Sequence, residues 1–308
     1  MGLVLTAAIG YGTLGVLARL AGEAGISTIT FVTWRASLGA SFLSLMVALG
    51  LGLGLIRSVR LADVPAAHWL QISTVAVLSI VANLAMFAGF ERTAIAFVMI
   101  CFYTYPVMVA VAATRVYDER LTRQRIVALA LALAGLGLMV VAPTSGETAD
   151  VEITGLALGL VAALAQAAYA LIAGRGYASL PAAQAAVTVT AISAVGFIAV
   201  ALLGGAADAL AEPFTTAGVW IWLILAATVG MAIPTVAILA GFRRMGPTRA
   251  SILMLLEPLV AVVLAAVILA ERPAPLQLLG GLLVLAGSVL AQLRGQPAQS
   301  MPPVPGVA

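Results

Sequence analysis

Apolar runs long enough to cross a lipid bilayer follow one another along almost the whole chain, and they constrain its fold more than any other feature. The chain has 308 residues, of which 63% are hydrophobic and 9% are charged. An ordinary soluble domain is about half apolar and about a quarter charged. Because a helix needs roughly 20 apolar residues to span the hydrocarbon core, the length allows about ten spans with short connections. The sequence therefore predicts an all-α integral membrane protein with no room for a separate catalytic, nucleotide-binding or nucleic-acid-binding domain.

Charged residues, glycines and prolines divide these runs into ten predicted transmembrane helices. We expect them near residues 3–20, 29–53, 69–90, 93–114, 126–141, 153–173, 182–203, 218–242, 250–270 and 276–293. The least obvious boundary is Glu91-Arg92, where two adjacent charges divide a run that is too long for one crossing. The run 3–20 has no basic segment before it, so we expect a helix there and not a signal peptide.

The ionisable residues exclude several kinds of chemistry. All 15 basic residues are arginines, so the chain has no lysine for a Walker A phosphate loop or a Schiff base. Cys101 and His68 are each the only residue of their type, which leaves no thiolate cluster and no multi-histidine metal site. A membrane-bound prenyltransferase or acyltransferase would need paired Asp clusters or a catalytic histidine, and Asp118-Glu119 is an isolated acidic pair. We therefore expect neither an enzyme nor an ATP-driven pump, and neither a metal nor a cofactor.

The arginines predict the orientation of the chain in the membrane. With a cytoplasmic N-terminus, eleven of them fall on the cytoplasmic side: Arg57, Arg60, Arg115, Arg120, Arg123, Arg125, Arg175, Arg243, Arg244, Arg249 and Arg294. The opposite side receives Arg19, Arg92 and Arg272, and Arg35 stays inside a span. Because cytoplasmic connections are enriched in basic residues, we expect both termini to be cytoplasmic. Residues 295–308 are rich in proline and are expected to be a disordered cytoplasmic tail.

A shift of about 152 residues superposes one half of the sequence on the other. The matches include charged, proline and glycine positions: Gly89-Phe90 with Gly241-Phe242, Arg92 with Arg244, Pro106 with Pro258, Glu119-Arg120 with Glu271-Arg272, and Ala134-Gly135 with Ala286-Gly287. Shared composition alone would produce Leu and Ala matches, so the evidence depends on these rarer residues. We expect two five-helix repeats, residues 1–145 and 146–294. An odd number of spans gives the repeats opposite orientations, which is the inverted-repeat design of secondary transporters.

The second repeat also carries the residues of a family pattern. Residues 241–251 are followed by Leu256-Glu257-Pro258, Glu271-Arg272, Gly280-Gly281 and Ala286-Gly287. This arrangement resembles the second repeat of EamA-type carriers in the drug/metabolite transporter superfamily, and within it the YddG-type amino-acid exporters. The first repeat matches through Pro106, Glu119-Arg120 and Gly135, and it has Tyr105 where the second repeat has Glu257. The resemblance implies a metabolite carrier with ten transmembrane helices in the bacterial inner membrane.

Polar and aromatic side chains deep inside the spans are the candidates for a substrate site, because each of them is costly in lipid. Asn83 is the only asparagine, and the repeat shift pairs it with Thr235. The expected cavity lining consists of Tyr11, Trp34, Asn83, Phe87, Tyr103, Gln166, Tyr169 and Thr235. Such a lining, with few charges, would accept apolar side chains of varied size. Ordinary packing is the alternative for the tyrosines, and a hydrogen bond between helices is the alternative for Asn83.

Two prolines at matching positions are candidates for gating. Pro106 and Pro258 each remove a helical hydrogen bond to the carbonyl four residues earlier, which belongs to Phe102 or Met254. These carbonyls could accept from a substrate ammonium group, but a simple helix kink is favoured over this role.

Two ionisable residues inside the spans are candidates for coupling or gating. Arg35 lies in the outer part of its span, where snorkelling to the surface is favoured over recognition of a carboxylate. Glu257 is the only carboxylate well inside a span, so a proton-coupled mechanism would have to use it, and packing or gating is the alternative.

Small residues spaced by four predict where two spans approach each other closely. Ala130 and Ala134 on the fifth span, and Gly287 and Ala291 on the tenth, provide such spacing. We expect this contact to be structural and to lie away from the cavity.

The expected function is ATP-independent export of small metabolites by alternating access around a central cavity, with amino acids, aromatic and neutral ones included, as the substrates. Efflux of drugs or cationic compounds is the alternative within transport. A membrane enzyme or a channel is less favoured, since neither catalytic clusters nor filter loops are visible. The expected partners are a small-molecule substrate and the lipid bilayer, without nucleic acid, and a monomer would suffice.

Overall fold

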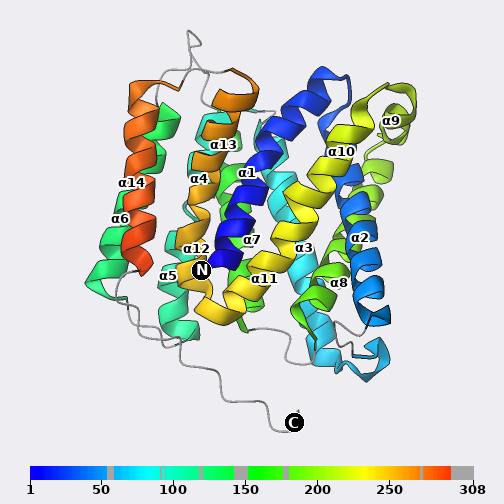
Figure 1. Ribbon diagram of the computed structural model, residues 1–308, viewed down its shortest axis with the longest axis horizontal. Coiled ribbons are helices and arrows are strands. Elements are labelled where there is room, and N and C mark those ends of the chain that lie inside the picture. Colours follow the sequence, from blue (N-terminus) through cyan, green and yellow to red (C-terminus); the bar gives the residue numbers. More distant parts are fainter. Residues whose placement is uncertain are drawn as a thin grey trace.

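The computed structural model describes residues 1–53, 59–90, 92–93, 95–117, 121–141, 152–175, 180–270 and 273–292, and every regular element in these ranges is helical (Figure 1). The first half contains α1 (Gly2–Glu23), α2 (Thr28–Gly52), η1 (Leu61–Asp63), α3 (Ala66–Phe90), α4 (Ile95–Phe102), α5 (Tyr105–Val116) and α6 (Arg123–Val141). The second half contains α7 (Ile153–Arg175), α8 (Ala182–Leu203), η2 (Asp208–Ala211), α9 (Glu212–Thr215), α10 (Val219–Ala227), η3 (Thr228–Ala232), α11 (Ile233–Met245), α12 (Pro247–Met254), α13 (Leu256–Ile268) and α14 (Pro275–Gln292).

Nine helical stretches in the described part of the chain are long and apolar enough to cross a membrane. They cover residues 2–23, 28–52, 66–90, 97–116, 123–140, 153–174, 182–203, 219–245 and 247–268, and a shorter apolar helix covers 275–291. Each corresponds to a predicted span, with ends that agree to within about four residues. α3 ends at Phe90 and α4 begins at Ile95, which confirms the predicted boundary at Glu91-Arg92. The predicted tail, 295–308, and the acidic residues Glu147 and Asp150 lie outside the described residues.

Two of the apolar stretches are each divided into two helices. α4 and α5 are separated at Tyr103-Thr104, and α12 and α13 are separated at Leu255. Pro106 is the second residue of α5 and Pro258 is the third residue of α13. A proline in the first turn of a helix loses no intrahelical hydrogen bond, since the first N–H groups of a helix have no partner inside it. The prolines therefore begin new helices in mid-span, where the sequence alone favoured kinks.

A π-helical turn interrupts the apolar stretch that runs from α10 into α11. This turn, η3, precedes Pro234, which is the second residue of α11. A proline ring clashes with the carbonyl four residues earlier in a regular α-helix, and a wider turn relieves this clash. Turns of this kind are frequent at functional sites. This turn was not predicted from the sequence.

The helices of the two halves begin and end at corresponding positions. Ile95 and Pro247, which begin α4 and α12, are 152 residues apart, and the same shift carries Phe102 onto Met254 at the ends of these helices. It also carries the break between α4 and α5 onto the break between α12 and α13. The shift found in the sequence is thus reproduced by the helix boundaries.

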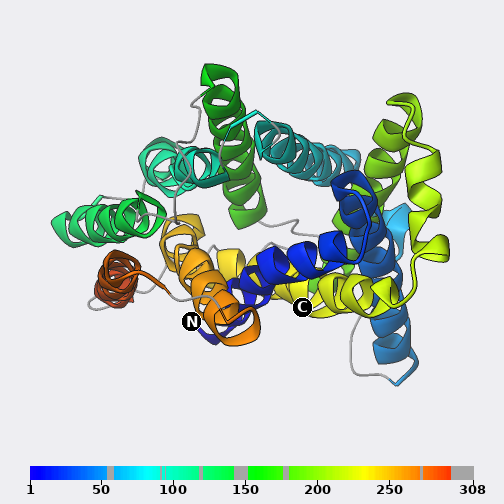
Figure 2. The ribbon, with the colours of Figure 1, turned by 90° about the horizontal axis from the view of Figure 1, so that it is seen from above.

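The first helix of each half packs among the helices of the other half. α1 contacts α10, η3, α11, α12 and α13, whereas α7 contacts α3, α4 and α5. In Figure 2, α1 in dark blue lies along the yellow and orange helices, and α7 in green lies with the cyan and teal helices on the opposite side. α2 packs along α8, and α6 along α14 at one edge of the molecule (Figure 1). Neither half forms its core alone.

The pair formed by α6 and α14 confirms the predicted close approach but corrects one of its faces. A Cβ atom at Gly135 would lie 2.4 Å from the carbonyl oxygen of Gly280, so the two backbones touch there. Ala128 and Ala132 on α6 are buried next to Gly287. The predicted residues Ala130 and Ala134 are exposed. The prediction chose the wrong face because small residues occur on both faces of α6.

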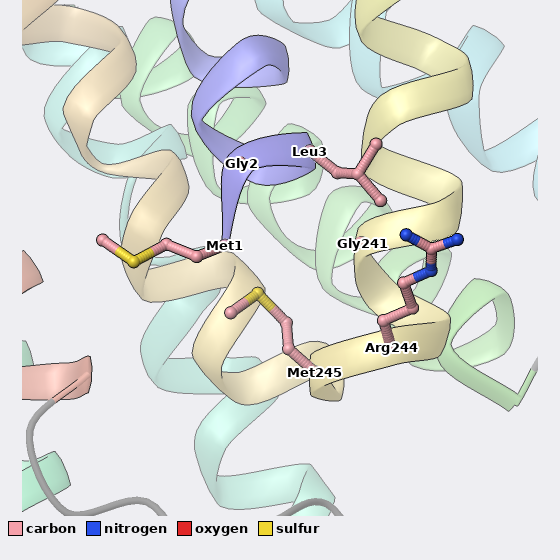
Figure 3. Close-up of a pocket in the computed structure, with 6 residues that line it drawn as sticks. All are labelled: Met1, Gly2, Leu3, Gly241, Arg244 and Met245. Atoms are coloured by element: carbon pink, nitrogen blue, oxygen red, sulfur yellow. The ribbon is translucent and has the colours of Figure 1, made fainter.

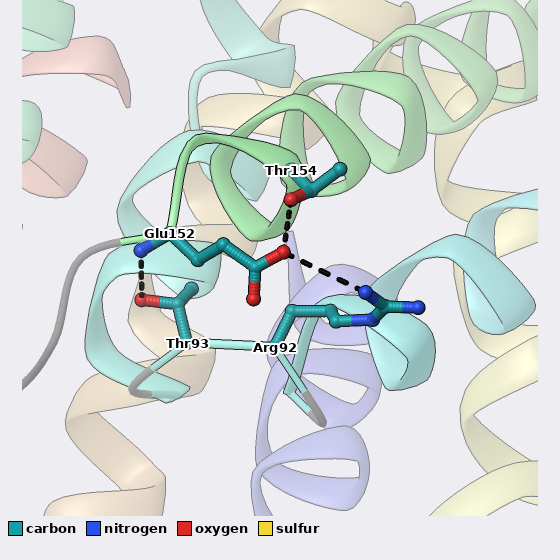
Figure 4. Close-up of polar contacts among 4 residues, drawn as sticks. All are labelled: Arg92, Thr93, Glu152 and Thr154. Atoms are coloured by element: carbon teal, nitrogen blue, oxygen red, sulfur yellow. Dashed lines mark hydrogen bonds and ion pairs between the residues drawn. The ribbon is translucent and has the colours of Figure 1, made fainter.

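An ion pair and one hydrogen bond join the start of α7 to the connection between α3 and α4 (Figure 4). Arg92 Nη1 lies 3.6 Å from Glu152 Oε1, and the Glu152 backbone N–H donates to Thr93 Oγ1 over 3.4 Å. The Thr154 hydroxyl donates to the same carboxylate. A Cβ atom at Gly155 would clash with the Thr93 side chain, so this glycine permits the contact. These contacts connect the two halves.

The opposite end of the molecule holds a pocket of about 260 Å³ (Figure 3). It is lined by Met1, Gly2, Leu3, Gly241, Arg244 and Met245. The start of α1 and the end of α11 therefore lie side by side. Tyr11 is roughly 15 Å further along α1 at 1.5 Å per residue, so this pocket is separate from the polar residues in the middle of the bundle.

Candidate functional site

Tyr11 and Thr235 meet in the middle of the bundle. The Tyr11 hydroxyl and Thr235 Oγ1 are 3.0 Å apart, and the threonine hydroxyl also lies 2.7 Å from the Met231 carbonyl oxygen, to which it donates. Met231 belongs to η3 and Thr235 to the first turn of α11. The hydrogen bond therefore connects the first helix of one half to the irregular part of the other half.

Arg35 and Asn83 form a second polar pair. Arg35 Nη2 donates to Asn83 Oδ1 over 3.1 Å, and Asn83 Nδ2 donates to the Ser79 carbonyl oxygen over 2.8 Å. Arg35 is only 7% exposed, and its guanidinium carbon lies 6.0 Å from the centre of the Phe31 ring. The expectation that Arg35 snorkels to the surface is therefore wrong. Asn83 provides an acceptor inside the bundle, and the long side chain turns toward it.

Glu257 lies among tyrosines at the break between α12 and α13. It interacts electrostatically with Tyr11, Tyr103 and Tyr105. The Tyr103 hydroxyl is buried and interacts with the Glu257 carboxylate, and it has no other hydrogen-bond partner. Tyr105 is the repeat partner of Glu257, so the breaks of both halves contribute to this cluster.

Two glycines allow α1 to lie against both irregular segments of the second half. A Cβ atom at Gly10 would lie 2.3 Å from Pro234 Cγ and 2.7 Å from the Val229 carbonyl oxygen. A Cβ atom at Gly12 would lie 2.9 Å from the Glu257 carbonyl oxygen. Only residues without a side chain permit such approaches. They hold Tyr11 between the π-helical turn and the break before α13.

Trp34 packs in a different hydrophobic cluster from Tyr11, Tyr103 and Tyr169. Its ring makes edge-to-face contacts with Phe214 and Trp220, with ring centres 5.5 and 5.2 Å away. Its indole N–H donates to the Leu210 carbonyl oxygen over 2.9 Å. Thr30 donates to the neighbouring carbonyl of Ala209 over 2.6 Å. Trp34 therefore anchors the connection between α8 and α10 on the start of α2.

The remaining predicted residues lie on the helices around the centre. Phe87 and Phe90 on α3 contact each other edge to face, with ring centres 5.7 Å apart. Tyr169 on α7 is buried, and its ring centre is 6.4 Å from that of Phe242. Gln166, one turn earlier on α7, is half-buried.

Pro106 and Pro258 each lie in the first turn of a helix that begins next to the cluster around Glu257. Pro106 follows the Tyr103-Thr104 break and Pro258 follows the Leu255 break. Phe102 and Met254 are not among the carbonyl acceptors of the described turn and cap hydrogen bonds. A role of these two carbonyls in substrate binding stays a prediction.

Three features of the site were missed from the sequence. The π-helical turn has no local signal other than Pro234. The repeat shift identified Tyr105 as the counterpart of Glu257 and predicted that the two helix breaks would correspond. It did not predict that Tyr105 and Glu257 would be neighbours. The direction of Arg35 depends on Asn83, which is 48 residues away in the chain. Among the described residues, the centre offers the buried cation of Arg35, the carboxylate of Glu257 and several hydroxyl groups, which suits recognition of a polar small molecule.

Comparison with known proteins identifies a family. The profile of the EamA-like transporter family matches residues 1–141 and 153–293, which are two successive segments of nearly the whole chain. A search of curated proteins finds no match. Among solved structures, 29 chains are similar. One of them, described as "Crystal structure of protein", superposes with a TM-score of 0.77 at 16% sequence identity and covers 94% of this chain and 95% of its own.

An identity this low shows a common fold and no more. The family match covers both halves of the chain and agrees with the apolar helices found in the structure. Proteins of this family are membrane transporters of small molecules. The chain therefore belongs to the EamA-like transporter family.

Proposed function

We propose that this protein is a secondary transporter that exports amino acids, aromatic and neutral ones included, by alternating access. The proposed architecture has ten transmembrane helices in two inverted five-helix repeats, residues 1–145 and 146–294. Five spans in each repeat require the second repeat to cross the membrane in the opposite direction to the first. The substrate would bind near the midplane, between the breaks in α4–α5 and α12–α13.

The observation that carries this proposal is the set of polar contacts between the two halves in mid-span. Tyr11 bonds to Thr235 across the halves, and Glu257 lies beside Tyr105, its repeat partner. Discontinuous helices that meet at a repeat interface are where secondary transporters bind their substrates. A purely structural bundle has no need for buried polar groups of this kind, because each is costly in lipid.

The proposed orientation places both termini in the cytoplasm of a bacterial inner membrane. Arg243, Arg244 and Arg249 lie around the connection from α11 to α12, at the same end of the molecule as Met1. Arg19 and Arg92 lie at the other end, beside the connections of α1 and α3. Cytoplasmic ends of membrane proteins are the more basic ones. A cytoplasm-only fluorescent reporter fused after Leu293 should fluoresce, and an active periplasmic phosphatase at the same point would overturn the orientation.

Counterflow in proteoliposomes tests the transport function directly. Vesicles loaded with unlabelled amino acid should accumulate the external radiolabelled amino acid transiently, with no ion gradient imposed. Liposomes without protein provide the control. A panel that includes phenylalanine, leucine and cationic dyes separates the substrate classes. Absence of counterflow with every solute would contradict the assignment as a carrier for these compounds.

Efflux of cationic compounds is the second candidate, and one observation favours it. Glu257 is a carboxylate surrounded by Tyr11, Tyr103 and Tyr105, and aromatic rings with a carboxylate are a suitable environment for an organic cation. The buried guanidinium of Arg35 disfavours it, because a substrate with only positive charge would be repelled. Counterflow of cationic dyes, without counterflow of amino acids, would support efflux of cationic compounds over amino-acid export.

A further inference from the structure

Arg35 is a buried cation without an anionic partner among the described residues. Its one described hydrogen bond is donated by Nη2 to the neutral amide of Asn83. Its Nε is buried and has no hydrogen-bond partner. A buried charge of this kind is unfavourable unless it is paired. A guanidinium presents its donors in a planar fork that fits a carboxylate, so the edge of the fork at Nε keeps a donor for one.

Asn83 holds this edge in place without neutralising it. The Asn83 Nδ2 group donates to the Ser79 carbonyl oxygen, which fixes the amide so that Oδ1 faces Arg35. An aspartate at this position would form an internal ion pair with Arg35. An asparagine orients the guanidinium and leaves its positive charge available.

Glu257 is a carboxylate without a cationic partner among the described residues. No basic side chain in the described part of the chain forms an ion pair with Glu257, and its surroundings are the hydroxyl-bearing rings of three tyrosines. The Tyr103 oxygen next to it is buried and has no hydrogen-bond partner other than this carboxylate. The carboxylate and the hydroxyl oxygen together would accept hydrogen bonds from an ammonium group, which has three donors.

Tyr11 interacts electrostatically with both of these groups, while its hydroxyl bonds to Thr235. The cation on α2 and the carboxylate on α13 therefore both lie within electrostatic range of one tyrosine on α1. Because they do not pair with each other, both charges are available to a ligand.

We propose that the site recognises a zwitterion, with Arg35 binding the carboxylate of the substrate and Glu257 binding its ammonium group. This assignment rests on the proposed transport function and specifies its substrate class by chemistry. The two charges discriminate against compounds that lack either group, because such a compound would leave one buried charge of the protein unpaired. The carrier is then selective for the head group and permissive for the side chain.

Three ligands with the same phenyl ring test this assignment as competitors of phenylalanine counterflow. Phenethylamine lacks the carboxylate, 3-phenylpropionate lacks the ammonium group, and unlabelled phenylalanine has both. The wild type should bind phenylalanine at least tenfold more tightly than either analogue. In Arg35→Gln the preference over phenethylamine should disappear, and in Glu257→Gln the preference over 3-phenylpropionate should disappear.

Arg19→Gln and Glu23→Gln are matched controls, since they remove the same charges from an exposed ion pair at the end of α1. Both should keep the wild-type order of the three ligands. Asn83→Asp provides a test that keeps Arg35. The new aspartate should form an internal ion pair with Arg35, so the KM for phenylalanine should rise at least tenfold. The melting temperature should be no lower than that of the wild type. This variant also covers the case in which Arg35→Gln fails to fold.

Equal competition by all three ligands in the wild type, or an unchanged KM in folded Asn83→Asp, would overturn the assignment while leaving the carrier function intact. Complete absence of counterflow in the wild type would instead contradict the transport proposal itself. The two failures are therefore distinguishable.

Discussion

The Tyr11 hydroxyl lies 3.0 Å from Thr235 Oγ1, although the two residues are 224 positions apart in the chain. The bond joins α1 to the first turn of α11, directly after the π-helical turn. In a carrier that alternates between two conformations, a bond across the halves stabilises one conformation more than the other, so its removal should change transport as well as stability.

We expect Tyr11→Phe to lower the stability of the protein by roughly 0.5–1.5 kcal/mol, the usual net contribution of one hydrogen bond. Thr235→Val should have a similar effect, and the double variant should be less destabilised than the sum of the two. Thermal unfolding in detergent, together with initial counterflow rates, measures the coupling. Strict additivity would show that the two hydroxyl groups do not act on each other.

Gly12→Ala is expected to destabilise the protein by about 1–3 kcal/mol, the range for overpacking. The added methyl group would lie 2.8 Å from Val260 Cβ and 2.9 Å from the Glu257 carbonyl oxygen, so α1 would have to move away from α13. Gly15→Ala on the same helix is the control, since nothing lies within 4 Å of its Cβ position. It should be neutral or slightly stabilising, because alanine favours helix more than glycine does. Equal melting temperatures for the two variants would contradict this packing.

The contact between α6 and α14 should depend on Gly280 in the same way. Gly280→Val would place side-chain atoms against the Gly135 carbonyl oxygen, 2.4 Å from the Cβ position, and against Met139. We expect separation of these two helices, reported by loss of a disulfide between cysteines introduced on their facing sides. Gly137→Val, whose Cβ position has no neighbour within 4 Å, should keep the cross-link. Persistence of the cross-link in Gly280→Val would count against close packing.

Glu152→Gln should change stability by less than about 1 kcal/mol. The Arg92 and Glu152 side chains are 59% and 44% exposed, and ion pairs in such surroundings contribute little. Gly155→Val should cost more, because its Cβ would lie 2.4 Å from Thr93 Cγ2. Melting temperatures of the two variants provide the comparison. A larger loss in Glu152→Gln would show that the charges, and not the packing, hold α7 to the first half.

Transport is expected to equilibrate the substrate across the membrane without obligatory proton exchange. Tyr105 occupies the position of Glu257 in the first half, so the repeat supplies no second carboxylate for a proton relay. An imposed pH gradient should therefore not cause the wild type to accumulate phenylalanine against its gradient. Accumulation by the wild type that Glu257→Gln loses, with counterflow retained, would identify Glu257 as a coupling residue.

The helices themselves could be predicted from the sequence because the hydrocarbon core imposes their length. Boundaries such as Phe90 and Ile95 follow from charges that lipid does not tolerate. The faces of the helices could not be predicted in the same way, since lipid and protein interior are both apolar. Ala128 and Ala132 are buried on α6 while Ala130 is exposed, and hydropathy does not separate them.

The residues of the site were predicted in part, and the errors in this prediction have a common cause. Tyr11, Asn83, Tyr103, Thr235 and Glu257 stand out in the sequence as polar groups in apolar spans. The structure places four of them on helices, and Tyr103 in the break between α4 and α5. Trp34 has the same appearance in the sequence but reaches the Leu210 carbonyl. Which partner a long side chain selects depends on helices that are distant in the chain, and no local pattern records it.

The packing of α1 on the second half has a consequence for biogenesis. The ribosome makes α1 first and α10 to α13 late, so α1 must wait in the bilayer while more than 200 further residues are synthesised. During this interval Gly10, Gly12 and the Tyr11 hydroxyl have only lipid or temporary neighbours. An insertion chaperone, or α1 of another chain, could bind the same surface that α13 later covers. Conditions that slow translation of the second half should expose the nascent protein to degradation.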